Sequence, residues 1–184
     1  IVERHIGLVP TNEAEGPDGR IETIAEHVAD HVDIDLLLRR AGDVEIPAVP
    51  AAPAAPAPDV RLAVARDAAF GFYYPGDLEA LQAAGAEIVA FDALSDPELP
   101  DCDGLFISGG FPETQMAALE ANESLRQSIR AALAAGLPAY AECGGLMYLA
   151  RSIAWQGETR QMVGAVPADV VMTSRPVGRG YVRL

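Results

Sequence analysis

Residues 137–149 read LPAYAECGGLMYL and change abruptly from an apolar strand pattern to a helical one. The apolar run Ala139–Ala141 follows a glycine and a proline that end the preceding helix, and it predicts a short buried strand. Gly144 and Gly145 then let the backbone turn sharply before apolar residues resume at helical spacing. The pattern places Cys143 at a strand-to-helix corner, as in a nucleophile elbow with sulfur in place of the serine oxygen.

A cysteine at the start of a helix lies among main-chain N–H groups that have no partner within the helix. These donors and the helix dipole favour a thiolate and can stabilise an oxyanion that forms next to it. Cys143 is therefore a candidate nucleophile. The competing interpretation is that Cys143 is a small buried apolar residue, as many unpaired cysteines are.

A second turn supplies the other half of the candidate site. Residues 103–113, DGLFISGGFPE, predict an apolar strand that ends in a glycine-rich turn, and residues 113–121 look helical. Ligands of open α/β sheets bind beyond the carboxyl ends of such strands, and the Gly109–Gly110 pair can direct main-chain N–H groups there. Alone, the motif is equally compatible with an ordinary strand-to-helix turn.

The rest of the chain after residue 60 alternates strand and helix patterns, which predicts an α/β fold with a parallel sheet covered on both faces. The predicted strands are 60–65, 87–91, 104–107 and 139–141, followed by one over 162–171 and the start of another at 181–184; the predicted helices are 75–84 and 123–135, with Asn122 as a cap. Asp67, Phe72 and Tyr73 should overhang the same sheet edge as Cys143. For the two aromatic residues, packing of the turn and contact with a substrate are both open.

Upstream of residue 60, two short helices and a spacer are expected. Residues 19–31 carry an amphipathic stripe, residues 33–40 predict a second short helix, and residues 1–10 read as a strand of a sheet whose other strands are not in this chain. Since residue 1 is not methionine, we expect an N-terminal truncation. Residues 47–59 are almost entirely alanine and proline and predict a semi-rigid linker.

Together these motifs resemble the glutaminase domain of the class I (triad-type) glutamine amidotransferases, in the branch of the cobyrinic and hydrogenobyrinic acid a,c-diamide synthases. The resemblance covers residues 60–184 and, more weakly, residues 3–10. Its motifs are RDAAFGFYY (66–74), GAE (85–87), ISGGFPE (107–113) and AECGGLMYL (141–149). Many amidotransferases outside this branch have glutamine four residues after the cysteine, whereas this chain has Met147.

The resemblance implies a flavodoxin-like amidotransferase domain over residues 60–184, preceded in residues 1–46 by the C-terminal end of a P-loop-type, ATP-dependent synthetase domain. Cys143 would attack L-glutamine, and Gly109, Gly110 and Gly144 would form the oxyanion and glutamine-binding site. Ammonia would amidate the a and c carboxylates of cobyrinic or hydrogenobyrinic acid, a corrinoid polycarboxylate. ATP and magnesium would act mostly outside this chain, and a homodimer is among the expected assemblies.

The family's catalytic histidine has no counterpart after Cys143, because all three histidines (His5, His27 and His31) precede the linker. We therefore expect the chain to be truncated before that histidine and inactive as a glutaminase by itself. Three alternatives remain open: an amidotransferase acting on nickel-sirohydrochlorin or another polycarboxylate, a cysteine hydrolase, and a non-catalytic binding domain.

Charge and composition exclude several other functions. The net charge is −14, with 27 acidic residues against 13 basic ones, so a nucleic-acid or anionic-membrane surface is not expected. The chain has no lysine, which excludes a phosphate-loop lysine or a Schiff-base lysine within it. Two cysteines and no signal peptide or membrane span predict a reducing cytoplasm without a structural disulfide. His27 and His31 lack further ligands, so we expect no metal site there.

Overall fold

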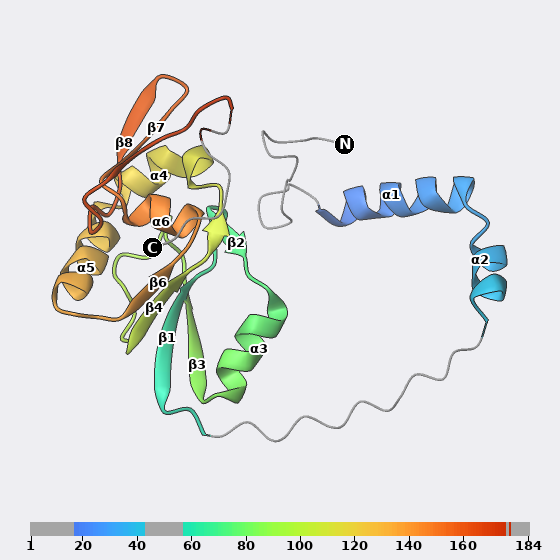
Figure 1. Ribbon diagram of the computed structural model, residues 1–184, viewed down its shortest axis with the longest axis horizontal. Coiled ribbons are helices and arrows are strands. Elements are labelled where there is room, and N and C mark those ends of the chain that lie inside the picture. The colour runs from blue at the N-terminus through green and yellow to red at the C-terminus, as the bar shows by residue number, and fades with distance from the viewer. Residues whose placement is uncertain (1–16, 43–56, 176, 178–184) are drawn as a thin grey trace. The chain divides into compact units, whose positions relative to one another are not determined.

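The computed structural model describes residues 17–42, 57–175 and 177, and the chain divides into two compact units, residues 1–54 and 55–184 (Figure 1). The predictions for residues 1–10, for most of the 47–59 linker and for residues 181–184 lie outside the described part. None of the helices in the described ranges combines the length and the apolar character that crossing a bilayer requires.

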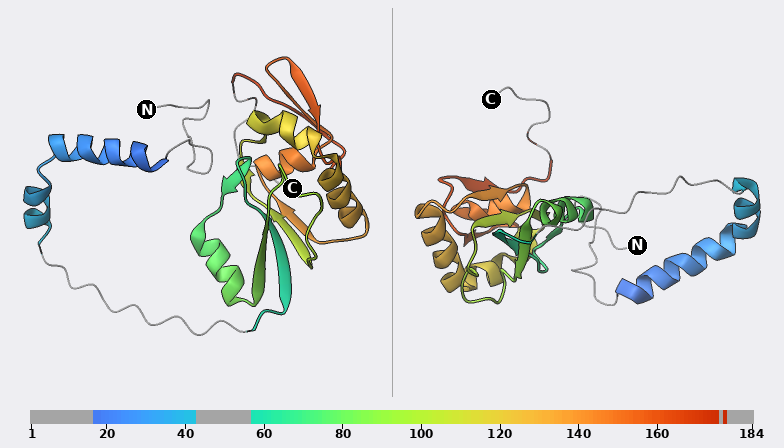
Figure 2. Two further views of the ribbon diagram at one scale, coloured as in Figure 1. Left: turned by 180° about the vertical axis from the view of Figure 1, so that it is seen from behind. Right: turned by 90° about the horizontal axis from the view of Figure 1, so that it is seen from below.

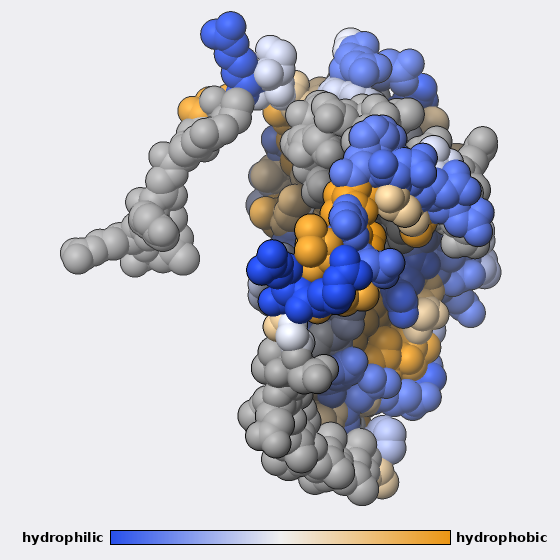
Figure 3. Space-filling model, turned by 90° about the vertical axis from the view of Figure 1, so that its right-hand side faces the viewer, coloured by the Kyte–Doolittle hydropathy of each residue, from blue (hydrophilic) through white to orange (hydrophobic). Residues whose placement is uncertain are grey.

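The first unit contains the two predicted helices, α1 (Pro17–His31) and α2 (Ile34–Ala41). The carboxylate of Asp33 accepts the N–H of Leu36 at 2.8 Å and so caps α2. Helix α2 has no buried residue. Within residues 17–42, the following large apolar side chains are exposed: Ile21, Ile24, Val28, Val32, Ile34, Leu36, Leu37 and Leu38. Figure 3 shows hydrophobic side chains, in orange, at the surface among hydrophilic ones.

The second unit is built on a four-stranded parallel sheet in the order β3-β1-β4-β6. Its strands are β1 (Val60–Ala65), β3 (Ala86–Phe91), β4 (Gly104–Ile107) and β6 (Ala139–Ala141). The register pairs Val64 with Phe106, and Phe106 with Tyr140. All four strands were predicted by the sequence pattern, and their parallel pairing confirms the α/β class.

Helices lie on both faces of this sheet, as predicted. Helix α3 (Pro75–Ala83) lies on one face, and α5 (Glu123–Ala134) and α6 (Gly144–Leu149) pack on the other (Figures 1 and 2). Alternation along the strands sorts the side chains between the faces. The core on the α5 and α6 side includes Ala63, Ala65, Leu105, Ile107, Leu125, Ile129 and Tyr148.

The connection from β4 to β6 follows the prediction closely. A 3₁₀ turn (Pro112–Gln115) leads into α4 (Met116–Ala121). The side chain of Asn122 then caps α5 by accepting the N–H of Leu125, and its amide donates to the carbonyl oxygens of Ala93 and Asp96 at 3.1 and 2.9 Å. Asn122 therefore fixes the start of α5 against the loop that follows β3.

The strand predicted over residues 162–171 is wrong for most of its length. Only β9 (Asp169–Val171) is a strand there; it pairs in parallel with β7 (Ser152–Trp155), which also forms an antiparallel hairpin with β8 (Glu158–Gln161). Gly164, at φ +72°, and Pro167 interrupt the apolar pattern. This three-stranded sheet contacts α4 and α6 (Figure 2).

A small antiparallel ribbon was also missed. Strand β2 (Phe70–Phe72) pairs with β5 (Gly109–Gly110), with Phe70 opposite Gly110 and Phe72 opposite Gly109. Three residues facing two glycines give no periodic signal, so the sequence could not reveal the pairing. The ribbon places the loop after β1 directly on the predicted oxyanion turn.

Candidate functional site

Cys143 lies between β6 and α6, where the sequence placed it. Its φ and ψ are 48° and −114°, one of two positive φ values among the described residues other than glycine. A residue with a side chain adopts this conformation only when the surrounding structure imposes it, as in nucleophile elbows. Cys143 is exposed, so the interpretation as a buried apolar residue is wrong.

The two glycines after Cys143 have a different role from the one expected. Neither Gly144 nor Gly145 has a positive φ, because the unusual backbone conformation falls on the cysteine itself. A Cβ at Gly145 would lie 2.1 Å from the carbonyl oxygen of Ile107, and one at Gly144 would lie 3.0 Å from the nitrogen of Gly110. These glycines therefore permit close approach of two backbones rather than a turn.

The second turn lies against this corner. A Cβ added at Gly109 would be 3.8 Å from the Cβ of Cys143, and the N–H of Gly145 donates to the carbonyl oxygen of Ser108 at 3.1 Å. The structure thus brings together all four predicted site residues, although they come from segments more than thirty positions apart in the chain. Main-chain N–H groups of a glycine turn and of a helix start next to an exposed thiol can stabilise a developing oxyanion.

Side chains beyond the four predicted site residues hold the two turns together. The hydroxyl of Ser108, which is only 3% exposed, lies within hydrogen-bond distance of the carbonyl oxygen of Phe72 (2.5 Å) and of Oε1 of Glu142 (3.0 Å). The hydroxyl of Tyr140 donates to the other carboxylate oxygen of Glu142 at 3.0 Å, and this bond raises the pKa of Tyr140. Glu142 directly precedes Cys143, but nothing in a sequence marks its partners.

The aromatic residues after β1 pack the site. The hydroxyl of Tyr73 donates to the carbonyl oxygen of Phe106 at 3.4 Å and accepts the N–H of Ser108 at 3.2 Å, and burial raises the pKa of Tyr73 to about 12. The ring of Phe72 meets that of Phe111 edge-on at 5.3 Å and covers Gly109. Of the two interpretations left open by the sequence, the observed contacts fit packing.

The other cysteine is not part of this site. Burial raises the pKa of the Cys102 thiol, and the carboxylates of Asp101 and Asp103 add to the shift. Both cysteines are free thiols. The environment of Cys102 therefore disfavours the thiolate, the nucleophilic form.

No side chains gather into a metal site among the described residues: none of them forms a group of three or more His, Cys, Asp and Glu suited to a metal ion. His31 instead lies with Nδ1 2.8 Å from the carbonyl oxygen of His27, in the last turn of α1. The sequence has no histidine after residue 31.

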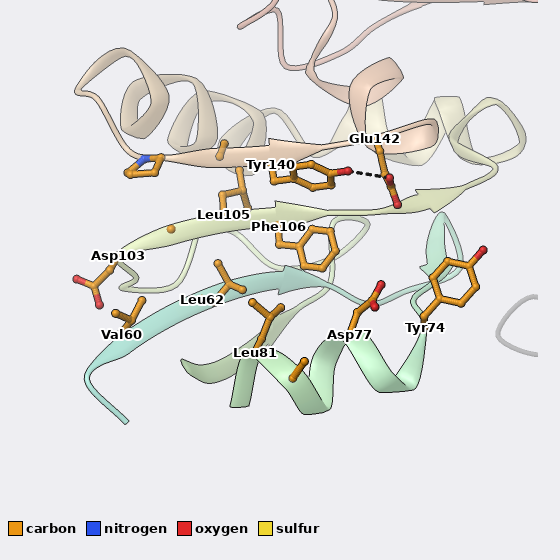
Figure 4. Close-up of a pocket in the computed structure, with 14 residues that line it drawn as sticks. Val60, Leu62, Tyr74, Asp77, Leu81, Asp103, Leu105, Phe106, Tyr140 and Glu142 are labelled. Carbon is orange, nitrogen blue, oxygen red and sulfur yellow. Dashed lines mark hydrogen bonds between the residues drawn. The ribbon is translucent and has the colours of Figure 1, made fainter. Parts of the chain in front are cut away.

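A groove runs along the sheet face that carries α3 (Figure 4). It has a volume of about 960 Å³ and is lined mainly by apolar side chains of β1, β4, β6 and α3, among them Leu62, Leu81 and Phe106. Figure 4 shows Tyr74, Asp77 and Glu142 at the end where the strands finish. Glu142 therefore lies between this groove and the Cys143 corner.

Comparison with known proteins adds to this geometry. Residues 61–184 match the family model described as the CobB/CobQ-like glutamine amidotransferase domain. Three relatives are named cobyrinate a,c-diamide synthase. The one from Magnetococcus marinus is 42% identical over 192 residues, which cover 100% of this chain and 41% of the relative. Those from Methanosarcina acetivorans and Listeria innocua are 43% and 41% identical; the matches cover 92% and 97% of this chain, and 39% and 40% of the relatives.

A crystal structure of a peptidase E protein from Listeria monocytogenes EGD-e superposes with a TM-score of 0.48, at 16% identity, over 60% of this chain and 64% of its own. The chain spans about two fifths of the length of the synthase relatives it matches. The family match itself extends over well over half of the chain and includes both turns of the site. The chain therefore belongs to the CobB/CobQ-like glutamine amidotransferase domain family.

Proposed function

We propose that this chain is the glutamine-hydrolysing part of a ligase of the cobyrinate a,c-diamide synthase type. The observation that carries the proposal is the exposed thiol of Cys143 at a strained corner beside the glycine turn, where a Cβ added at Gly109 would lie 3.8 Å from the Cβ of Cys143. The names of its relatives support the choice of ligase. The free thiols of both cysteines are compatible with a reducing cytoplasm.

In this proposal the thiolate of Cys143 attacks the side-chain amide carbon of L-glutamine, and the carbonyl π electrons move onto oxygen. The resulting oxyanion is stabilised by main-chain N–H groups of Gly144 and of the Gly109–Gly110 turn. Collapse of this intermediate breaks the C–N bond, and the leaving nitrogen takes up a proton to depart as ammonia. Water then hydrolyses the thioester to glutamate and restores the thiol.

The proton transfers need a base, which the family provides as a histidine. No histidine follows residue 31 in the sequence, so residues 60–184 do not contain one. We propose, as the resemblance implies, that the base is supplied outside residues 60–184. The second unit alone would then hold a positioned nucleophile and oxyanion site without efficient turnover.

The residues that the structure describes do not fit a lysine-dependent phosphate loop or a magnesium site. The chain has no lysine to contact phosphates, and no suitable cluster of three metal ligands exists among the described residues. We propose that ATP-dependent activation of the a and c carboxylates of cobyrinic or hydrogenobyrinic acid takes place in a separate domain of the protein. Residues 1–46 would be the C-terminal end of that domain, and residues 47–59 would link it to the second unit. The proposed assembly is a homodimer.

The test uses the full-length protein and the variant Cys143→Ala. The variant should lose glutamine-dependent amidation of the corrinoid polycarboxylate and keep amidation driven by added ammonium salts, because the thiol only releases ammonia. A matched control is Cys102→Ala, which should keep both activities. Loss of both activities in a folded Cys143→Ala protein would contradict the proposal, and amidation of nickel-sirohydrochlorin instead of the corrinoid would reassign the substrate.

A further inference from the structure

The carboxylate of Asp67 gathers three main-chain N–H groups from two loops. Its Oδ1 accepts the N–H groups of Ala69 and Phe70 at 2.7 and 3.1 Å, and its Oδ2 accepts that of Ala93 at 2.7 Å. The backbone N–H of Asp67 also donates to the carbonyl oxygen of Phe70 at 3.2 Å. One side chain thus closes the loop after β1 and ties it to the loop after β3.

The loop that Asp67 closes is the one that contacts the oxyanion turn. The carbonyl oxygen of Ala69 accepts the N–H of Phe111 at 3.0 Å, and β2 pairs with β5. The backbones are so close that a Cβ at Gly110 would lie 1.9 Å from the oxygen of Ala69. A shift of residues 69–72 would therefore move Gly109 and Gly110 directly.

From the turn, the contacts continue to the nucleophile. A Cβ added at Gly144 would lie 3.0 Å from the backbone nitrogen and oxygen of Gly110, and the carbonyl oxygen of Ser108 accepts the N–H of Gly145. Phe70 also packs on the ring of Tyr148 in α6, with ring centroids 5.3 Å apart. The loop after β1 thus contacts both the turn that would hold the oxyanion and the helix that begins at the thiol.

We propose that Asp67 is a positioning residue for glutamine hydrolysis: it fixes the Gly109–Gly110 N–H groups at the place where the oxyanion forms, without touching the substrate. This inference rests on the proposed function. The carboxylate of Asp67 accepts main-chain N–H groups of both loops, so it can act on the turn through the backbone. Burial raises its pKa despite the three N–H donors, so the group is held in an enclosed environment.

A carboxylate is needed because the donors approach from two sides. Asparagine at this position has one acceptor oxygen, so it can accept from Ala69 and Phe70 or from Ala93, and its amide NH₂ must then face a donor. Asp67→Asn is therefore expected to loosen one side of the link while changing the side-chain volume little. Asp96 offers a matched control, since its carboxylate accepts a single main-chain N–H, that of Asp92 at 2.8 Å, which asparagine can still accept.

The two variants are compared in the full-length protein by glutamine hydrolysis and by alkylation of Cys143 with iodoacetamide. Alkylation forms no oxyanion, so its rate reports the reactivity of the Cys143 thiol and does not depend on the position of the Gly109–Gly110 turn. Asp67→Asn should lower kcat by roughly 10- to 100-fold, with KM for glutamine and the alkylation rate each changed by less than about threefold, because a displaced donor affects the transition state. Asp96→Asn should change each quantity by less than about twofold.

Hydrogen exchange of the peptide that contains Gly109 and Gly110 gives a readout that needs no activity. This peptide should exchange faster in Asp67→Asn than in Asp96→Asn, with unchanged circular dichroism in both. Unchanged exchange and kcat in Asp67→Asn, or an equal loss of hydrolysis and alkylation, would overturn the inference. Wild-type protein that hydrolyses no glutamine would refute the proposed function, while the exchange comparison would still decide the role of Asp67.

A second variant covers the case in which Asp67→Asn does not fold. Phe72→Leu loosens the same contact from the other end of the ribbon, since the side chain of Phe72 lies 3.3 Å from the Cβ position of Gly109. It should also lower kcat more than it lowers alkylation. A folded Phe72→Leu protein with the kcat of the wild type would overturn the inference.

Discussion

Gly110→Ala should be among the most damaging single-methyl substitutions in the second unit. The added Cβ would lie 1.9 Å from the carbonyl oxygen of Ala69, 2.8 Å from its carbonyl carbon and 2.9 Å from the Cα of Phe70. Contacts below 3.0 Å do not persist, so the ribbon must separate by about 1 Å. All three clashing atoms are backbone or carbonyl atoms, which cannot rotate away.

The expected cost has two parts. Overpacking of this kind costs about 1–3 kcal/mol, and loss of the hydrogen bond from Phe111 to Ala69 adds about 1 kcal/mol. A total of about 2–4 kcal/mol corresponds to a decrease in Tm of roughly 6–15 °C for a domain of this size. The same 1 Å shift would misplace the oxyanion donors and lower kcat for glutamine hydrolysis by about 100-fold.

Thermal unfolding followed by circular dichroism measures the first effect, and glutamate release by the full-length protein measures the second. Gly76→Ala is the matched control, because it adds the same methyl group within α3 where nothing lies within 4 Å. That control should be neutral or stabilising by up to about 1 kcal/mol. If Gly110→Ala melts at the temperature of the wild type, the close approach of the two backbones is not as described and the argument fails.

Three further predictions concern the same unit. Limited iodoacetamide treatment of folded protein should modify Cys143 at least about tenfold faster than Cys102, whose pKa is raised by burial, and preferential modification of Cys102 would contradict the site. Asn122→Ala should cost about 2–3 kcal/mol in urea unfolding, since it removes a helix cap and two hydrogen bonds to the loop after β3; a loss below about 0.5 kcal/mol would contradict that role. The pKa of Tyr73 is raised from 10.0 to about 12, so the folded state favours the neutral phenol. The contribution of the neutral phenol to folding stability is therefore complete below pH 10 and is lost as the pH rises towards 12. Tyr73→Phe should therefore lose less stability than the wild type between about pH 9 and about pH 11, and equal losses would count against this assignment.

The sequence predicted the parts of the fold that depend on local pattern. The strands of the parallel sheet are short apolar runs bounded by turn residues, and α5 has a recognisable cap in Asn122 and a stop in Gly136, which adopts φ +96°. Cys143 could be placed for the same reason, because a strand, a corner and a helix follow one another within a dozen residues. The close contact between this corner and the Gly109–Gly110 turn followed from the rule that parallel strands end at one edge.

What the sequence could not provide depends on contacts between distant segments. The carboxylates of Asp67 and Glu142 have partners about 25 to 35 positions away, and no periodicity reports them. The prediction of a strand over residues 162–171 was wrong because it rested on the valines of this segment, whereas Gly164 and Pro167 interrupt the strand pattern. The glycines of the elbow were correctly singled out for the wrong reason, since backbone proximity and not backbone conformation requires them.

The backbone of Cys143 has a consequence for how this protein can be engineered. A conformation of φ 48° and ψ −114° costs a residue with a side chain roughly 1–3 kcal/mol, whereas glycine adopts it freely. Folding stability and reactivity therefore favour different residues at this one position. A library of variants selected only for thermal stability should accumulate glycine at position 143, and its most stable proteins should be those that have lost the thiol.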